Sequence, residues 1–287
     1  MWLQNRKRLN DNQALAGQTA LITGASQGLG RAFAAECARR GMDLALVALP
    51  GSGLEEVAGA IARRWGVRVE ALALDLTAPE GPEAACRWLA ETGLEVSALI
   101  NNAGTGYNRR FEDSSLRENE ACILLNNLAL VKMTRLLLPQ LKRSPRAYAL
   151  NVASLAAFFP MPYMPVYGPS KAFILSFSLG LRQELRGSGV SVSVLCPNGI
   201  RTNAQTCAQI AAGGLAARLT CLDAEDVARN AVAQMLRGAD VIVPGALNRV
   251  ICAMSRFVPR AAVYAVVGAF WGRTARPASV ATKPVGA

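Results

Sequence analysis

The stretch TALITGASQGLG, from Thr19 to Gly30, decides the fold of this chain. It begins with an apolar run of strand length and continues into a turn with three glycines, Gly24, Gly28 and Gly30. A helical pattern follows as far as residue 40, and Gly41 ends it. This order of strand, glycine turn and helix is typical of dinucleotide sites, where the helix N-terminus holds a pyrophosphate. A plain structural turn would use the same glycines.

The alternation of strands and helices continues along the chain. Further buried strands are expected at residues 43–47, 67–74, 96–100, 146–152, 190–196 and 240–243. Helices are expected at residues 51–65, 79–92, 117–142, 163–186 and 223–236. This alternation predicts an α/β fold, a single-domain Rossmann-type doubly wound parallel sheet of about seven strands with helices on both faces. The domain spans residues 17–248, between a polar arm at 1–16 and an amphipathic segment with a flexible tail at 249–287.

The composition excludes several kinds of chemistry. None of the 287 residues is a histidine, which removes Ser-His-Asp triads and most catalytic zinc sites, and no metal site is expected. The seven cysteines are scattered, which predicts reduced thiols in a cytoplasmic protein. The net charge of +11 comes from dispersed basic residues, so nucleic acid is not an expected partner. The apolar runs are too short for a membrane-spanning helix, and the N-terminus does not have the pattern of a secretory signal.

Tyr167 and Lys171 form a candidate catalytic pair. Residues i and i+4 of a helix share one face, so the phenol and the ammonium are expected side by side. A tyrosine titrates near pH ~10, and a neighbouring cation lowers that pKa. The pair therefore predicts an acid–base group built without histidine. Taken singly, Tyr167 also fits an ordinary aromatic at a helix start, and Lys171 a solvated surface charge.

The order of the motifs resembles the short-chain dehydrogenase/reductase family. The motifs are TGASQGLG at 23–30, Asp75, NNAG at 101–104, Asn126, Ser154, YGPSK at 167–171 and CPNGIRT at 196–202. The resemblance covers roughly residues 17–244 and extends to the branch of hydroxysteroid dehydrogenases and 3-ketoacyl reductases. It implies an oxidoreductase that transfers hydride between a nicotinamide cofactor and a carbonyl or secondary alcohol.

The resemblance also implies the catalytic residues Asn126, Ser154, Tyr167 and Lys171. Tyr167 would move the proton, while Lys171 would lower its pKa and bind the nicotinamide ribose. Ser154 would stabilise the developing charge on the substrate oxygen, and Asn126 would hold a water of the proton relay. Taken singly, Asn126 also fits a buried residue that bonds a loop, and Ser154 a cap after a strand.

Cofactor contacts are implied for Tyr167, Lys171 and four further segments. These are Gly24, Ser26, Gln27, Gly28, Leu29 and Gly30; Asp75 and Leu76; Asn102, Ala103 and Gly104; and Ile200 with Thr202. The last segment departs from the family, because Asn198 follows Pro197 where relatives commonly carry glycine. The loop over the nicotinamide is therefore expected to differ in shape.

The choice between NADP and NAD is expected to depend on the end of the second strand. Residues 48–50 (Ala-Leu-Pro) offer neither the acid that binds an NAD ribose nor a base for a 2′-phosphate. Gln27 stands where many NADP-binding relatives carry a basic residue. The Gly-Ser-Gly turn at 51–53 offers N–H groups and a hydroxyl to a phosphate, or it is simply a helix start. These features favour NADP over NAD.

Apolar residues at 158–162 and Met164 follow Ser154 and favour an apolar lipid-, steroid- or ketoacyl-like substrate. The alternative is that they pack the next helix. Residues 203–220 correspond to the mobile substrate lid of the family. The rival functions are an NAD-dependent alcohol dehydrogenase for a small polar substrate and a non-catalytic cofactor-binding scaffold.

Residues 249–273 mix apolar runs with four arginines. Such a pattern predicts amphipathic helices that either lie on a membrane surface or pack on the domain or a partner subunit. Relatives commonly pair through their two long helices, so a homodimer or homotetramer is expected. The protein is expected in the cytoplasm, with peripheral membrane contact as an alternative.

Overall fold

A computed structural model of the chain describes residues 15–201, 220–254 and 268. The strands are β1 (Thr19–Thr23), β2 (Asp43–Ala48), β3 (Val69–Ala73), β4 (Val96–Asn101), β5 (Ala147–Val152), β6 (Val190–Leu195), β7 (Ile200–Arg201), β8 (Leu222–Asp223) and β9 (Val241–Ile242). The α-helices are α2 (Gly28–Arg39), α3 (Leu54–Trp65), α4 (Gly81–Thr92), α5 (Leu116–Ile123), α6 (Leu130–Arg143), α7 (Tyr167–Glu184), α10 (Ala224–Leu236) and α11 (Ala246–Met254). Three short helical segments are η1 (Phe111–Asp113), η2 (Leu124–Ala129) and η3 (Leu155–Ala157).

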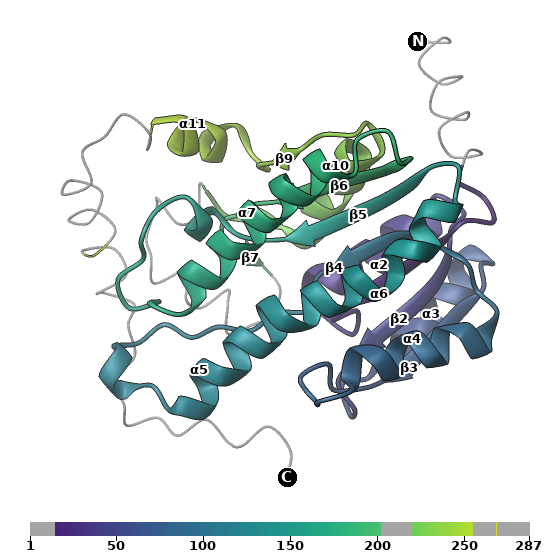
Figure 1. The fold of residues 1–287 in the computed structure, drawn as a ribbon, viewed down its shortest axis with the longest axis horizontal. Helices are drawn as coiled ribbons and strands as arrows, with labels where there is room; N and C mark the ends of the chain where they lie inside the picture. The colour runs from purple at the N-terminus through teal and green to yellow at the C-terminus, as the bar shows by residue number, and fades with distance from the viewer. Residues whose placement is uncertain (1–14, 202–219, 255–267, 269–287) are drawn as a thin grey trace.

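Seven strands form one sheet in the order β3-β2-β1-β4-β5-β6-β9, and every neighbouring pair is parallel. Helices α2, α3 and α10 cover one face, and α4, α6 and α7 cover the other (Figure 1). This arrangement confirms the predicted doubly wound fold. The strand order reverses at β1, between β2 and β4. In such sheets a ligand binds beside this point, at the carboxyl ends of the strands.

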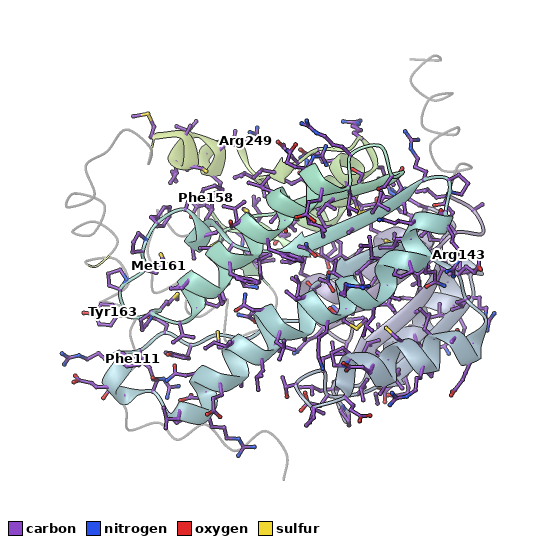
Figure 2. The ribbon with its side chains drawn as sticks, viewed as in Figure 1. Phe111, Arg143, Phe158, Met161, Tyr163 and Arg249 are labelled. Atoms are coloured by element: carbon purple, nitrogen blue, oxygen red, sulfur yellow. The ribbon has the colours of Figure 1, made fainter. Side chains whose placement is uncertain are left out.

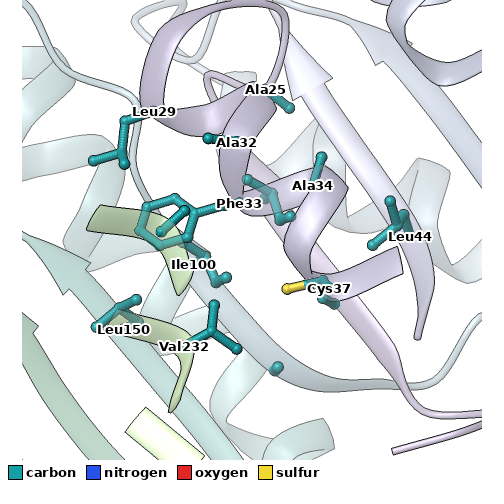
Figure 3. Close-up of a cluster of buried hydrophobic side chains, with 14 of the residues drawn as sticks. Ala25, Leu29, Ala32, Phe33, Ala34, Cys37, Leu44, Ile100, Leu150 and Val232 are labelled. Atoms are coloured by element: carbon teal, nitrogen blue, oxygen red, sulfur yellow. The ribbon is translucent and has the colours of Figure 1, made fainter. Parts of the chain in front are cut away.

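The core explains why the strands are continuous apolar runs. Every residue of β1, β4 and β5 is buried, as expected for strands covered by helices on both faces. On one face, Phe33 of α2 points toward Ile100, Leu150 and Val232 (Figure 3). Leu15, which the sequence assigned to the solvated arm, is 4% exposed and joins the same cluster. The packed domain therefore begins earlier than residue 17.

The helix predicted at 117–142 is continuous but not uniform. It runs from Leu116 to Arg143 as α5, the π-helical segment η2 and α6. Its inner face packs on the sheet through Met133, Leu137 and Leu141. By length and composition it is the one helix of the described residues that is able to cross a membrane. The buried inner face is that of a core helix, and a π-helical turn inside an α-helix often marks a functional site.

Helix α7 begins at Tyr167 rather than at residue 163 as predicted. Tyr163 has φ of 66°, a left-handed conformation that interrupts any helix before it starts. The later start places Pro169 at the third helical position, where no intrahelical N–H donor is needed. Tyr167 thus stands at the first position of the helix.

Candidate active site

The glycine turn closes on the N-terminus of α2. Gln27 is the N-cap, and the first turn holds no acidic residue. A Cβ added to Gly30 would lie 1.9 Å from the Gly24 carbonyl oxygen, so only glycine lets the turn fold back on the helix. The first N–H groups of the helix lack intrahelical partners and carry the positive end of its dipole. The cradle therefore fits the pyrophosphate of a dinucleotide, which Ser26 and the N–H groups of Gly28, Leu29 and Gly30 would bind.

Asn102 braces this turn from the end of β4. Its Nδ2 donates to the carbonyl oxygens of Thr23 at 2.9 Å and Gly24 at 3.1 Å. The Thr23 hydroxyl in turn accepts the N–H groups of Asn102 and Ala103, both at 3.0 Å. The Nδ2 of Asn102, a residue predicted to line the adenosine ribose side, is therefore committed to the turn. Thr23 was not among the predicted site residues, although its place directly before the glycine turn is the sequence signal for it.

The other predicted cofactor residues lie at the same edge of the sheet. Asp75 follows β3, and its Oδ1 accepts the N–H and the hydroxyl of Thr77 at 2.8 and 2.7 Å. Leu76 is buried in the core beneath it, and Ile200 lies in β7 against the core. Thr202 and most of the lid predicted at 203–220 lie outside the described residues. The carboxylate of Asp75 thus has one oxygen committed to a turn.

Ser154, Tyr167 and Lys171 come together beyond the end of β5. Ser154 caps η3, and its side chain interacts with that of Tyr167. Lys171 lies one turn after Tyr167 on α7, with its Nζ 5.6 Å from the centre of the tyrosine ring. The Nζ donates to the Val152 carbonyl at 3.0 Å, and the lysine is only 4% exposed. The two side chains share one helix face, as their spacing predicts.

The electrostatics of the pair differ from the sequence-based expectation. Burial raises the pKa of Tyr167, and the hydrogen bond from Ser154 offsets part of that rise. Burial also lowers the pKa of Lys171 to about 8. The net direction is therefore opposite to the predicted lowering of the tyrosine pKa, because burial is the largest contribution. The ammonium is itself desolvated and points at a carbonyl, so Tyr167 keeps its proton at neutral pH.

Asn126 lies in the π-helical segment and is 1% exposed. Its Oδ1 accepts the Thr105 N–H at 2.9 Å, and its Nδ2 donates to the Thr105 carbonyl and to Ser170 Oγ, each at 2.9 Å. A Cβ on Gly104 would lie 3.0 Å from Asn126 Oδ1 and 3.2 Å from Lys171 Nζ. The side chain thus fixes the loop after β4 beside Lys171. Its role in a water relay stays a prediction.

The wall beside Tyr167 is formed by the loops after β4 and β5. A Cβ on Gly106 would lie 2.3 Å from Tyr167 Cδ2, so this glycine, absent from the prediction, packs on the ring. The Arg109 N–H donates to the Tyr163 carbonyl at 2.9 Å and ties the two loops together.

The apolar residues after Ser154 lie in the loop that leads to α7. Figure 2 shows Phe158, Met161 and Tyr163 along it. Met161 is 7% exposed and lies 3.6 Å from a Cβ placed on Gly168, so it packs the helix. Within the described ranges no cluster of His, Cys, Asp or Glu is able to hold a metal ion.

Comparison with known proteins connects this geometry to relatives. The profile of the short chain dehydrogenase family matches residues 18–211. A very-long-chain 3-oxoacyl-CoA reductase from Anas platyrhynchos is 35% identical over 190 residues, 65% of this chain and 61% of that protein. The human 17-beta-hydroxysteroid dehydrogenase type 3 is 35% identical over 189 residues, 65% of this chain and 60% of that protein. The matched region thus spans about three fifths of these relatives' length.

A solved structure agrees with the fold over nearly its whole length. The short-chain dehydrogenase from Sphingobium yanoikuyae in complex with NADPH superposes with a TM-score of 0.71 at 31% identity, covering 94% of this chain and 98% of that one. The family profile covers about two thirds of the chain and includes the glycine turn, Ser154, Tyr167 and Lys171. The chain therefore belongs to the short-chain dehydrogenase/reductase family of NAD(P)-dependent oxidoreductases.

Proposed function

We propose that this protein interconverts a carbonyl and a secondary alcohol with a nicotinamide cofactor, acting on an apolar lipid-, steroid- or ketoacyl-like substrate. The observation that carries the proposal is the contact of Ser154 with Tyr167, one helical turn from the buried Lys171. These groups lie at the edge of the sheet that also holds the glycine turn. A proton donor and a dinucleotide cradle therefore lie at the same edge of the sheet, where ligands bind in folds of this kind.

The residues perform the proton chemistry of a reduction. A nicotinamide held by the glycine turn would supply the hydride for the carbonyl carbon. Ser154 donates a hydrogen bond to the carbonyl oxygen and stabilises the charge that develops there. Tyr167, held protonated by burial, transfers its hydroxyl proton to that oxygen, and the product is the alcohol. Lys171 stabilises the resulting phenolate, and the oxidation of an alcohol uses the same groups in reverse.

We assign NADPH rather than NADH as the preferred cofactor. NADPH occupies the related Sphingobium yanoikuyae enzyme. In this chain no acidic side chain follows β2 directly to repel a 2′-phosphate. The buried Ser52 hydroxyl has no hydrogen-bond partner among the described residues, so it is able to donate a hydrogen bond to a 2′-phosphate. Glu56 opposes this preference, because its Oε2 lies 2.9 Å from a Cβ placed on Gly53, at the start of α3.

The substrate class is supported by the relatives and by the composition of the wall. The two curated relatives are a 3-oxoacyl-CoA reductase and a hydroxysteroid dehydrogenase, whose names denote oxo and hydroxy groups on large apolar skeletons. The loop before α7, which follows Ser154 and precedes Tyr167, carries the apolar residues Phe158 and Met161. An apolar ketone would bury its skeleton there while Ser154 and Tyr167 hold its oxygen. We also propose that the protein is cytoplasmic and forms a homodimer or homotetramer, with peripheral membrane contact as the alternative.

The experiment that tests the function is Tyr167→Phe, which removes only the hydroxyl. We expect NADPH-dependent reduction of apolar ketones to fall by at least about a hundredfold, the scale of general acid catalysis. NADPH binding, followed by fluorescence titration, is expected to stay within about threefold of the wild type. A ketone reduction that survives the change would contradict the assignment. A wild type that binds cofactor without any turnover would identify a scaffold.

A further inference from the structure

The loop after β6 is tied to the C-terminal helix by two asparagines. Asn248, in α11, is 1% exposed, and its Oδ1 accepts Nδ2 of Asn198 at 3.4 Å. Its own Nδ2 donates to the carbonyl oxygens of Thr220 at 3.0 Å and Pro244 at 2.9 Å. A buried amide with both ends bonded is a rigid junction, because moving it leaves polar groups unpaired away from water. Asn248 therefore joins three places: the loop after β6 at Asn198, the chain before β8 at Thr220, and the turn before α11 at Pro244.

The same loop is bonded to the proposed catalytic groups on its other side. The Pro197 carbonyl accepts the Leu155 N–H at 2.8 Å and the Ser154 hydroxyl at 3.4 Å. Pro197, whose carbonyl accepts the Ser154 hydroxyl, is directly followed by Asn198, whose side chain bonds Asn248. The two hydrogen bonds therefore hold neighbouring residues of the loop. Hydrogen bonds thus link Ser154 to the Pro197 carbonyl and the side chain of the next residue, Asn198, to Asn248 in α11.

Asn198 is the residue that departs from the pattern, which carries glycine after the proline. A glycine offers no side chain to Asn248 and leaves the loop backbone freer. The turn before α11 is shaped for the junction as well. Gly245 has φ of +85°, and a Cβ there would lie 3.2 Å from Asn248 Nδ2. The asparagine at position 198 and the buried Asn248 are therefore joined by a hydrogen bond that a glycine at 198 would not make.

We propose that Asn248, acting through Asn198, is a positioning residue that fixes residues 197–201 at the place where the nicotinamide half of the cofactor binds. This inference rests on the proposed function, since it assumes a nicotinamide beside Ser154 and Tyr167. Asn248 itself does not touch the cofactor. Its effect is to hold the loop in one conformation before binding, which spares the cost of ordering the loop.

The test separates the two halves of the cofactor. Dissociation constants are measured by titration calorimetry for NADPH and for 2′,5′-ADP, which fills only the adenine side. We expect Asn198→Gly and Asn248→Ala each to weaken NADPH binding about three- to tenfold, the worth of one hydrogen bond, and to leave 2′,5′-ADP unchanged. Combining the two changes should add little to Asn248→Ala alone. The control is Asn230→Ala, an exposed asparagine of α10.

Equal losses for both ligands, or no loss for NADPH, would overturn the positioning role while the oxidoreductase assignment stands. A wild type that binds no nicotinamide cofactor would instead remove the proposed function, and this inference with it. If Asn248→Ala does not fold, Asn198→Gly decides alone, because it removes one bond from a partly exposed side chain. Should the wild type prefer NADH, NADH and ADP replace the two probes.

Discussion

At the scale of single residues, Lys171 shows how function and stability oppose each other. The proposed mechanism needs a cation beside Tyr167, and the fold supplies it inside α7 with 4% exposure. Burial without a carboxylate partner lowers its pKa to about 8. The charged form of Lys171 therefore lowers the unfolding free energy of the protein at neutral pH, and the packing of the surrounding core offsets this loss.

This cost predicts that Lys171→Met stabilises the protein. At pH 7 the folded lysine is still largely charged, so the variant should gain on the order of 1–3 kcal/mol in unfolding free energy, with loss of turnover. The folded pKa lies below the unfolded value, so the unfolded chain binds more protons between about pH 8 and pH 10.5. Wild-type stability therefore rises relative to the variant across this window. Urea titrations of both proteins from pH 7 to 10.5 measure the difference, and a constant difference would contradict the lowered pKa.

The residue pair was predictable from spacing, but its protonation was not. Residues four apart on a helix must share a face, which the sequence states directly. The direction of the tyrosine pKa depends on burial and on where Lys171 Nζ points, and the Val152 carbonyl that orients it comes from β5. The same limit applies to Asn126, whose partners Thr105 and Ser170 lie in a loop and in another helix.

At the scale of elements, β1, the glycine turn and α2 are packed so closely that they form one rigid unit. The turn folds back so closely that a Cβ on Gly30 would meet backbone at 1.9 Å. Hydrogen bonds from Asn102 hold the same carbonyls in place. A backbone obstacle of this kind has no flexible end to move aside, so the turn and the helix must shift together.

We therefore expect Gly30→Ala to abolish measurable NADPH binding and to lower the unfolding free energy by at least about 2 kcal/mol. The matched control is Gly59→Ala in α3, where the nearest atom is the flexible end of Arg63 at 3.2 Å. That change should leave binding intact and stabilise the helix by up to about 1 kcal/mol. Thermal unfolding and cofactor titration of both variants provide the comparison. Wild-type binding by Gly30→Ala would exclude this turn as the cradle.

Helix α11 presents a second element-scale feature, an outward apolar face. Its exposed residues are Leu247, Val250, Ile251 and Met254, whereas Asn248 and Cys252 are buried. The sequence from residue 241 to the end contains six basic residues and no acidic one. An apolar face in a cationic segment is the composition that binds anionic lipid surfaces.

We expect the full-length protein to float with vesicles of phosphatidylcholine and phosphatidylglycerol at low salt, and less so with phosphatidylcholine alone. Val250→Glu places a charge on the exposed face and should weaken binding about tenfold or more, because it removes apolar burial and adds repulsion. Leu49→Glu, at a leucine after β2 that is 44% exposed against 57% for Val250, is the control and should bind as the wild type does. Equal flotation of Val250→Glu and wild type would exclude α11 as the contact.

At the scale of the whole molecule, the parallel doubly wound sheet was predictable because strands and helices alternate in sequence and parallel crossovers are right-handed. The positions at which helix α7 and the packed domain begin were harder to predict, because contacts distant in sequence set them. Helix α7 starts at Tyr167 because Tyr163 is held in a left-handed conformation, with its carbonyl bonded to Arg109 in another loop. Leu15 packs in the cluster formed by α2 and the sheet. The residues next to Leu15 in the sequence do not indicate this contact.

The molecule also exposes apolar side chains along its two long helices. Ile123, Leu124, Leu128 and Leu136 are 36–52% exposed on the helix from 116 to 143, and Phe173 is 44% exposed on α7. The rings of Phe173 and Phe177 stack with centroids 6.0 Å apart. The segments η2 and α7 pack against each other, so these exposed side chains lie on adjoining elements. A second copy of the chain that meets these side chains with its own would bury them by two-fold symmetry.

We expect the wild type to sediment as a dimer or tetramer at micromolar concentration, and Leu128→Arg to shift it toward monomer. The arginine would place two like charges across the two-fold axis in an apolar contact, where neither is solvated. Leu247→Arg introduces the same side chain on α11 and is the control, because it should weaken vesicle binding and leave assembly unchanged. A monomeric wild type would refute the paired-helix interface. So would an oligomer that Leu128→Arg leaves intact, since a stable interface depends on its apolar centre.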